Sequence, residues 1–369
     1  MNSPERFRRA LAGEPVDRLP VIEWATWWDQ TLDAWHAAGL DPALQDLHAL
    51  HDYFGLDRQH QFWIPVRDEG CPQPAGFGAP ILWDEADYER ILPHLYTDRL
   101  LEGIQRECRR IHREMGDYAF WYSLDGFFWF PRTLFGIENH FFAFYDYPEL
   151  MTRINEDLCA YYKKVLAIVN EETEPVFMTF AEDMSYNHGP MCSYAQYAQF
   201  VLPYYQQLTP LVRAGGAHPF IDTDGNVEPL IPWFLEGGIE GILPLERMAG
   251  VDVCRIKEKY PQLLMLGGFD KTVMHKGEAA MRAEFARILP AVRAGGYIPA
   301  VDHQTPPDVT VENYRIFVRL LREVSFAPYG PCAPYEPCGS SGVPGWNFGG
   351  GPKVTPSGAP GPAPLGGAP

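Results

Sequence analysis

The feature that most constrains the fold is a unit that occurs three times between residues 211 and 303. In each copy a helical segment ends on Gly-Gly, a short apolar run follows, and the run stops at an acidic residue. The three copies read LVRAGGAHPFIDTD, FLEGGIEGILPLE and AVRAGGYIPAVDH. A Gly-Gly pair after a helix supplies the left-handed backbone that ends the helix and turns the chain toward a strand. The unit therefore predicts a chain of alternating helices and strands.

The apolar runs are short and do not alternate with polar residues, which is typical of parallel strands buried on both faces. Three further runs fit the same scheme: residues 118–126, 174–183 and 262–270. Amphipathic stretches between the runs predict helices over residues 197–213, 251–259, 279–293 and 311–324. About seven or eight strands alternating with helices predict an α/β fold, a single (β/α)8 barrel of the TIM type.

The composition divides the chain into two parts. Residues 1–326 are the predicted barrel domain, within which residues 1–115, rich in tryptophan and helical patterns, are expected to form an N-terminal cap and lead-in. Residues 327–369 are rich in Pro and Gly and have few charged or aliphatic residues. Such a segment buries too little apolar surface to offset its ordering entropy. We expect this C-terminal tail to be disordered.

Charge and cysteine content exclude several classes of protein. The net charge of −18 argues against nucleic acid or an anionic membrane surface as a partner. No apolar run is long enough to span a membrane, and the N-terminus lacks the apolar core of a signal peptide. The seven cysteines are scattered and include no Cys-x-x-Cys pair. We expect a cytoplasmic protein with no disulfide framework, no thiolate zinc cluster and no membrane span.

Acidic residues follow nearly every predicted strand. The carboxyl ends of the strands carry the active site in barrels of this type, so residues at these ends are candidates for function. They are Asp125, Glu182, Asp183, Asp222, Asp224, Glu246, Asp270, Asp302 and His303. A single acid after a strand commonly caps a helix or fixes a turn, and Asp270 with Lys271 also suggests a local ion pair. Nine such residues at one end of a barrel predict a site.

Asp222 and Asp224 are the centre of this prediction, because like charges so close cost free energy unless a cation or a shared proton lies between them. A ring of such groups can hold a divalent cation through oxygen and imidazole ligands, or it can bind an organic cation. It can also separate into an acid with a raised pKa and a base with an ordinary one. The residues leave these three alternatives open.

We assign roles to the candidates as follows. The catalytic candidates are Glu182, Asp183, Asp222 and His303. The substrate-binding candidates are Asp125, Asn187, Asn226, Glu246, Asp270 and Asp302. The candidate metal ligands are Asp222, Asp224 and His303. Aromatic stretches at residues 24–35, 60–65 and 120–130 mostly predict core packing, although an aromatic mouth suits a flat, apolar ligand.

Five segments together resemble the uroporphyrinogen decarboxylase superfamily. They are RFRRALAGEPVDRLPV, AEDMSYNHGPMCSYAQYAQFVLPYYQQL, DTDGNVEPLIPWFLEGGIEGILPLE, LMLGGFDK and GGYIPAVDHQTPPDVTVENYRIFVRLL, and the resemblance covers residues 1–325. It implies a single (β/α)8 barrel with a funnel at the carboxyl ends of the strands. It also implies one of two chemistries: decarboxylation of uroporphyrinogen without a cofactor, or zinc-dependent methyl transfer involving corrinoid proteins or thiols.

The chain departs from both branches of this superfamily. The decarboxylases carry an arginine-bearing segment of the type Arg-Gln-Ala-Gly-Arg where this chain has IEWATWWDQTLDAW. The zinc methyltransferases carry His-x-Cys where this chain has Asp222-Thr223-Asp224, and a further cysteine near Asp302-His303. A thiolate zinc site of that type is therefore excluded. A harder site of Asp222, Asp224 and His303, with Glu246 nearby, suits zinc first and also manganese or iron.

We expect a methyltransferase that acts on a small methylated substrate with a corrinoid protein as partner. A metal would polarise the leaving group, and without one a carboxyl would serve as general acid. The alternative is a decarboxylase of a tetrapyrrole or another carboxylate, which needs no cofactor. A two-carboxylate hydrolase and a barrel that only binds a ligand or serves as a scaffold are further alternatives. The superfamily makes a homodimer reasonable.

Overall fold

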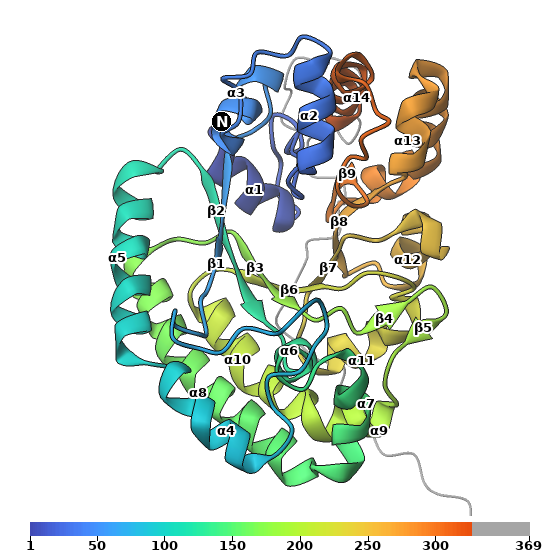
Figure 1. Cartoon of the computed structure of the whole chain (residues 1–369). Helices are drawn as coiled ribbons and strands as arrows, with labels where there is room; N and C mark the ends of the chain where they lie inside the picture. Colours follow the sequence, from blue (N-terminus) through green and yellow to red (C-terminus); the bar gives the residue numbers. More distant parts are fainter. Residues whose placement is uncertain (327–369) are drawn as a thin grey trace, which may run out of the picture. The chain divides into compact units, whose positions relative to one another are not determined.

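The computed structural model describes residues 1–326 (Figure 1), so the predicted disorder of residues 327–369 lies outside the described residues. Within them, seven parallel strands form one sheet in the order β1-β2-β3-β6-β7-β8-β9. These strands are β1 Gln59–Trp63, β2 Ala119–Asp125, β3 Phe177–Ala181, β6 His218–Asp222, β7 Gly241–Leu243, β8 Leu264–Phe269 and β9 Tyr297–Val301. A separate antiparallel hairpin consists of β4 Ser185–Tyr186 and β5 Gly189–Pro190.

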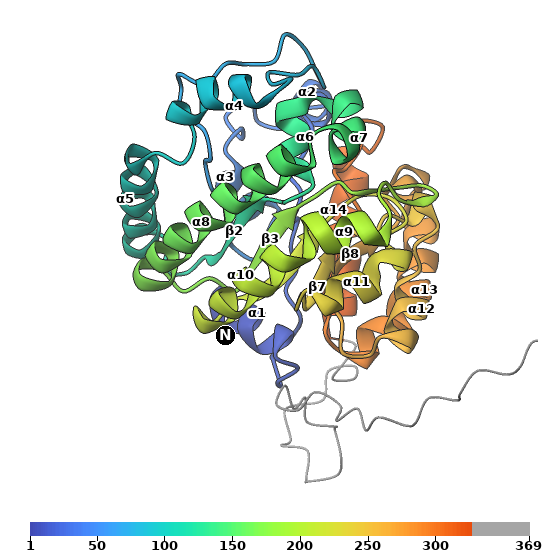
Figure 2. The same ribbon diagram turned by 90° about the horizontal axis from the view of Figure 1, so that it is seen from below.

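Helices connect the strands and surround the sheet (Figures 1 and 2). The α-helices of the described residues are α1 Ser3–Leu11, α2 Asp29–Ala37, α3 Leu47–Phe54, α4 Glu85–Ile91, α5 Asp98–Glu114, α6 Trp129–Phe135, α7 Ile137–Asp146, α8 Pro148–Glu172, α9 Tyr194–Phe200, α10 Leu202–Ala214, α11 Ile231–Glu236, α12 Val253–Lys259, α13 Glu278–Ala294 and α14 Val311–Ser325. Short 3-10 turns are η1 Leu92–His94, η2 Glu228–Leu230, η3 Arg247–Ala249 and η4 Lys271–Lys276.

The Gly-Gly units behave as the sequence predicts. The second glycine of each pair has a positive φ, at +81° for Gly216, +80° for Gly238 and +63° for Gly296, and a strand follows each pair. One predicted helix is wrong in its extent, because residues 197–213 divide into α9 and α10 at Val201. Pro203 lies in the first turn of α10, where its missing N–H costs nothing, whereas in the middle of one long helix it would remove a hydrogen bond.

The strands have two faces with different partners. Inward side chains such as Trp121, Phe177, Phe220 and Ile298 form an apolar cluster inside the curved sheet. Outward side chains, among them those of β3, pack with the helices in a larger cluster. Burial of both faces explains why the strand sequences are continuously apolar. The observed α/β barrel architecture confirms the predicted fold class.

An extended segment, residues 19–25, occupies the position between β9 and β1. The indole N–H of Trp24 donates to the carbonyl of Val301 in β9, at 2.8 Å. The side-chain amide of Gln59 in β1 donates to the carbonyl of Glu23. Ile22 and Trp24 belong to the inner cluster. The segment therefore serves as the eighth member of the barrel wall, although it does not form a regular strand.

The N-terminal 115 residues contribute to the barrel as well as to helices outside it. Phe7 and Leu11 of α1 belong to the inner cluster, and α1 contacts both β2 and β9. The first strand, β1, also lies within this segment.

In the described residues no helix combines the length and the apolar character needed to cross a membrane. The cysteines of residues 1–326 are free thiols.

Candidate functional site

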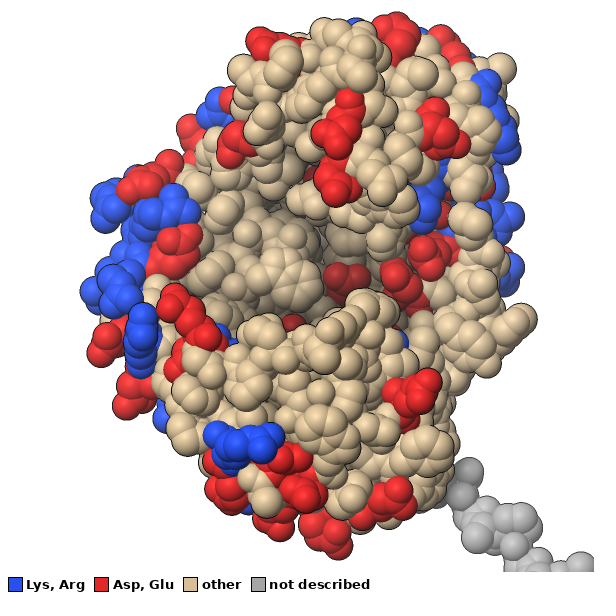
Figure 3. Space-filling view, in the orientation of Figure 1, with Lys and Arg blue, Asp and Glu red and all other residues tan. Residues whose placement is uncertain are grey.

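The carboxyl ends of β2, β3 and β6 lie level with one another. The register pairs Asp125 with Ala181, and Ala181 with Asp222. The acids that follow these strands therefore emerge at one height, as expected for a parallel barrel. Figure 3 shows that the molecule is hollowed on this face, with Asp and Glu side chains gathered along one side of the hollow.

Alternation along the strands decides which acids face the interior. Trp121 is an inward residue of β2, so Asp125, four positions later, also points inward. Phe220 likewise places Asp222 on the inner face of β6. Beyond the end of β3, the Glu182 carboxylate turns to the backbone N–H groups of residues 127–129, whereas the charge of Asp183 acts on Asp222. Two neighbouring candidates thus point in opposite directions.

Asp183, Asp222 and Asp224 influence one another electrostatically. Burial, and then the charges of Asp183 and Asp224, raise the pKa of Asp222 well above its usual value. Burial, followed by Glu246 and Asp183, raises the pKa of Asp224 to about 7, although 43% of its side chain is exposed in the hollow. Within residues 1–326, the Asp222 carboxylate has no hydrogen-bond or ion-pair partner. The cluster therefore holds protons at pH values where isolated aspartates are ionised.

His303 faces this cluster from the end of β9. Its Nε2 lies 3.8 Å from Oδ2 of Asp224, and its ring stands edge-on to Trp24, with 6.4 Å between ring centroids. Burial, and then the positive charge of Lys271, lower the pKa of His303. The imidazole is therefore neutral near pH 7, so its contact with Asp224 is a polar contact rather than a full ion pair.

Lys271 joins the ends of β7, β8 and β9. Its Nζ lies 3.5 Å from Oε1 of Glu246 and 3.7 Å from Oδ1 of Asp302. Asp302 is fully buried and accepts the backbone N–H groups of Arg247 and Lys271, at 2.9 and 3.1 Å. Burial still raises the pKa of Asp302 to about 6, against the effect of Lys271. The expected ion pair of Lys271 with Asp270 is wrong, because Asp270 caps η4 instead.

Glu182 is fully buried behind the hollow. Its two oxygens accept the backbone N–H groups of Phe127, Phe128 and Trp129 at 2.8 to 3.0 Å, and Tyr205 donates its hydroxyl to the same carboxylate. A Cβ at Gly126 would lie 2.0 Å from the Glu182 carboxyl carbon, so only glycine fits there. These contacts hold the start of α6 against β3 and use the hydrogen-bonding capacity of the carboxylate.

Among the described residues, the contacts of the remaining candidates do not include the carboxyls of Asp183, Asp222 or Asp224. Asp270 accepts the backbone N–H and the hydroxyl of Thr272, at 2.8 and 2.6 Å, as the cap of η4. Asn226 accepts the N–H of Glu228 at 3.3 Å. Asn187 is exposed in the turn of the β4–β5 hairpin. Asp125 is half-buried at the mouth, and desolvation raises its pKa to about 6 while Arg67 opposes the shift.

Comparison with known proteins agrees with this architecture. A sequence model described as uroporphyrinogen decarboxylase (URO-D) matches residues 80–324. The chain belongs to the uroporphyrinogen decarboxylase family. A solved structure described as a methyltransferase from Methanosarcina mazei has 16% sequence identity and a TM-score of 0.57, over 88% of this chain and 99% of that chain. At this identity the likeness concerns the fold. No curated protein sequence matches this member of the family.

Arg132 is a site residue that the sequence analysis missed. Its guanidinium in α6 donates to the backbone carbonyl of Asp183 at 3.1 Å and lies over the Trp129 ring, 5.3 Å from its centroid. The structure shows no ion pair for Arg132 among the described side chains, and its Nε is buried without a partner. Its position in FFWFPRTLF, the only basic residue of an aromatic stretch after an inward aspartate, was an available signal.

The metal site expected from the sequence does not have a convergent ligand set in this structure. Across residues 1–326, no group of three or more His, Cys, Asp or Glu side chains is arranged to hold a metal ion. Asp224 and His303 are close, but Asp222 does not complete a three-ligand site with them. Metal binding by this trio stays a prediction.

Proposed function

We propose that this member of the uroporphyrinogen decarboxylase family is a methyltransferase that uses a protonated carboxyl of the Asp183–Asp222–Asp224 cluster as its general acid. The observation that carries the proposal is the inward convergence of these three carboxyls in the hollow. Their mutual repulsion and burial favour retention of a proton near neutral pH. A group that keeps its proton at the working pH can donate it to a leaving group.

In the proposed reaction the protein supplies one proton, and the acceptor supplies the electron pair for its new bond to the methyl carbon. The bond between the methyl group and its oxygen or nitrogen breaks, and the electron pair stays on that heteroatom. The heteroatom takes the proton of Asp222, while Asp183 and Asp224 stabilise that proton on Asp222 until transfer. The methyl group passes to a nucleophilic acceptor, for which we propose a corrinoid carried by a separate protein. The methyltransferase from Methanosarcina mazei, which has a similar fold, is consistent with this reaction class.

The test is methyl transfer to free cob(I)alamin, followed by the absorbance change of the corrinoid. The methyl donors are methanol, aromatic methyl ethers and methylamines, each supplied separately. Wild type should react with at least one of these, and Asp222→Asn should lower the rate about 100-fold, the usual size of a general-acid effect. Asp46→Asn is the matched control, because the Asp46 carboxyl caps α3 and is not among the strand-end candidates, and it should retain the wild-type rate.

Metal content is measured on the same preparations by mass spectrometry. A stoichiometric divalent ion that is present in wild type and lost in Asp222→Ala would replace the general-acid role with metal anchoring. Equal rates for wild type and Asp222→Asn in metal-free protein would contradict the acid role of Asp222.

A second function, decarboxylation of a carboxylate substrate, is favoured by Arg132. Its guanidinium has no carboxylate partner among the described residues although it lies beside Asp183. Such a cation can bind a substrate carboxylate. Release of CO2 from a porphyrinogen or a smaller carboxylate, lost in Arg132→Gln and without methyl transfer to cob(I)alamin, would establish this function in place of the first.

A further inference from the structure

A cavity of about 680 Å³ lies between α3 and α14, outside the strand-end site. Its volume is in the range of small-molecule sites, about 300–1,000 Å³. Phe54 and Val318 are buried side chains of the core that form part of its lining. Tyr53 stacks edge-on against Phe54, with 5.0 Å between ring centroids, and is 43% exposed. The cavity therefore offers an apolar, partly aromatic surface to a ligand.

Three arginines of α14 line the same cavity: Arg315, Arg319 and Arg322. Their spacing of four and three residues places them on neighbouring turns of the helix. Among the described residues of the lining, the only acid is Glu323, which pairs with Arg319 at 3.2 Å and with Arg282 at 3.1 Å. Two acids outside the lining also pair with these arginines, since Glu312 lies 3.4 Å from Arg315 and Glu278 lies 2.7 Å from Arg319. Arg322 is therefore the lining arginine whose positive charge has no ion-pair partner among the described residues, in a chain whose net charge is −18.

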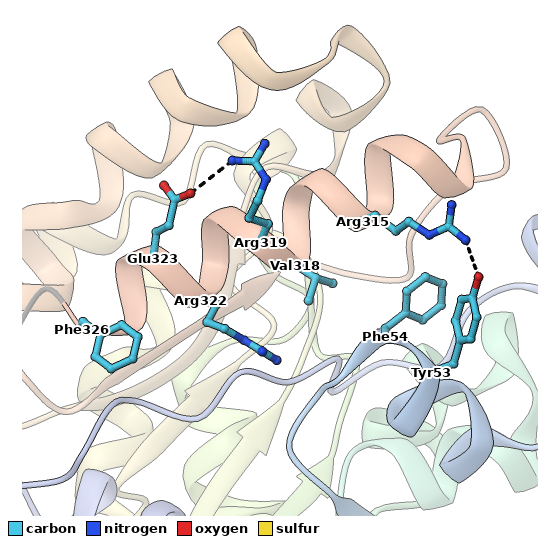
Figure 4. Close-up of a pocket in the computed structure, with 8 residues that line it drawn as sticks. All are labelled: Tyr53, Phe54, Arg315, Val318, Arg319, Arg322, Glu323 and Phe326. Carbon is cyan, nitrogen blue, oxygen red and sulfur yellow. Dashed lines mark hydrogen bonds and ion pairs between the residues drawn. The ribbon is translucent and has the colours of Figure 1, made fainter. Parts of the chain in front are cut away.

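The three guanidiniums differ in how they are held (Figure 4). Arg315 donates to the hydroxyl of Tyr53 and lies 5.6 Å from the centre of that ring. Arg319 and Glu323 point toward each other on the far side of α14 from Tyr53, whereas Arg322 extends toward the α3 side. Arg322 donates to the carbonyl of Gly55, which ends α3, and forms no ion pair within residues 1–326.

We propose that this cavity binds a small amphipathic anion, a molecule with an apolar body and one carboxylate. The apolar body would lie on Tyr53, Phe54 and Val318, where burial of apolar surface favours it. The carboxylate would take charge-assisted hydrogen bonds from Arg322 and Arg315, whose planar guanidiniums match carboxylate geometry. The charge of the rest of the molecule repels such an anion, so the arginines supply the local attraction.

The test is isothermal titration calorimetry of the full chain with decanoate, with decanol as the uncharged match. Decanoate should bind saturably, and decanol about tenfold more weakly or worse, since a charge-assisted hydrogen bond contributes more than a neutral one. Arg322→Gln should weaken decanoate about tenfold and leave decanol unchanged. Tyr53→Ala should weaken both, because it removes apolar surface from the cavity.

Arg293→Gln is the matched control, because Arg293 is an exposed arginine on α13 that does not line the cavity. It should bind decanoate as wild type does, and thermal unfolding checks that every variant is folded. Equal affinity for decanoate and decanol, or decanoate binding that Arg322→Gln leaves unchanged, would overturn the proposal. Displacement of decanoate by inorganic phosphate at equal concentration would also overturn it, in favour of a site for simple anions.

Discussion

Glu182 and Asp222 lie side by side at the carboxyl ends of β3 and β6, yet the fold uses them in opposite ways. The backbone N–H of Glu182 donates to the carbonyl of Asp222 at 2.9 Å. The Glu182 side chain points outward and accepts four protein donors. The Asp222 side chain points inward and has no hydrogen-bond partner among the described residues. An acid at a strand end is therefore structural or available for chemistry according to the face it occupies.

The pKa values of the two groups rise for partly different reasons. Burial raises the pKa of Glu182 to about 7 against the opposing effect of Tyr205 and three backbone N–H groups. Burial also dominates at Asp222, where neighbouring carboxyls add to the rise instead of opposing it. Hydrogen bonds therefore partly offset the cost of burying Glu182, whereas nothing offsets the cost at Asp222, an environment that is common for catalytic groups.

The largest expected effect concerns Glu182, the structural member of this pair. Glu182→Ala leaves three buried N–H groups and the Tyr205 hydroxyl without their acceptor, so the free energy of unfolding should fall by about 3–5 kcal/mol. Glu182→Gln, which retains one acceptor oxygen, should lose about half as much. Urea unfolding followed by circular dichroism measures both. A stable but inactive Glu182→Ala variant would instead make Glu182 a catalytic residue, as the sequence analysis proposed.

Asp222→Asn tests whether Asp222 serves the reaction and not the stability of the fold. The substitution replaces the carboxyl that we propose is protonated with an uncharged amide of nearly the same shape, so the free energy of unfolding at pH 7 should stay equal or rise by about 1 kcal/mol. Activity should fall about 100-fold, as measured with cob(I)alamin. A large loss of stability in this variant would show that Asp222 supports the fold in the same manner as Glu182.

The pH dependence of stability follows from the raised pKa of Asp224, about 7 in the folded protein. Its contribution is fully present below the unfolded pKa of about 3.9 and is lost as the pH rises through about 7, because the folded state must then hold a charge that it disfavours. The urea midpoint should therefore fall between pH 5 and pH 8. Asp224→Asn should reduce this fall. An unchanged pH profile in that variant would contradict the electrostatic coupling of the cluster.

Glu23 offers a smaller test away from the mouth. This carboxyl is buried beside Tyr314, which donates to its Oε2 at 3.0 Å, and burial raises its pKa well above the usual value. Glu23→Gln keeps an acceptor for Tyr314 and carries no charge. The variant should gain about 1 kcal/mol at pH 8 and less at pH 5, where Glu23 is already neutral. Equal gains at the two pH values would contradict a titrating Glu23.

The smallest effect is expected at Asn187. Its side chain is exposed in the hairpin turn, so Asn187→Ala should change the free energy of unfolding by less than about 0.5 kcal/mol. If Asn187 contacts substrate, as the sequence predicts, the KM should rise while kcat is retained. An unchanged KM would remove Asn187 from the site.

The arrangement of strands and helices could be predicted because it depends on local patterns. Gly-Gly pairs end the helices before β6, β7 and β9, and continuous apolar runs mark strands that are buried on both faces. The acids at strand ends could be found in the same way, since a parallel barrel brings those ends together. The division between α9 and α10 at Val201 could also be found from the sequence, because Pro203 lacks the N–H that the middle of a helix requires.

Other features required the tertiary structure because they depend on groups that are distant in sequence. The position of residues 19–25 beside β9 depends on the contact of Trp24 with Val301, 277 residues away. The pairing of Lys271 with Glu246 and Asp302, rather than with its neighbour Asp270, depends on how three loops meet.

The sequence by itself determined the barrel and the set of acids at its mouth, because chain-local geometry and the periodicity of strands are written in neighbouring residues. Only the tertiary structure decided which of these acids is structural and which is available for chemistry. Glu182 and Asp183 are adjacent in the chain just beyond β3, yet the Glu182 carboxylate accepts the backbone donors at the start of α6, whereas the charge of Asp183 acts on Asp222. Donors, charges and burial reach each carboxyl through space, so its protonation and role are properties of the folded protein.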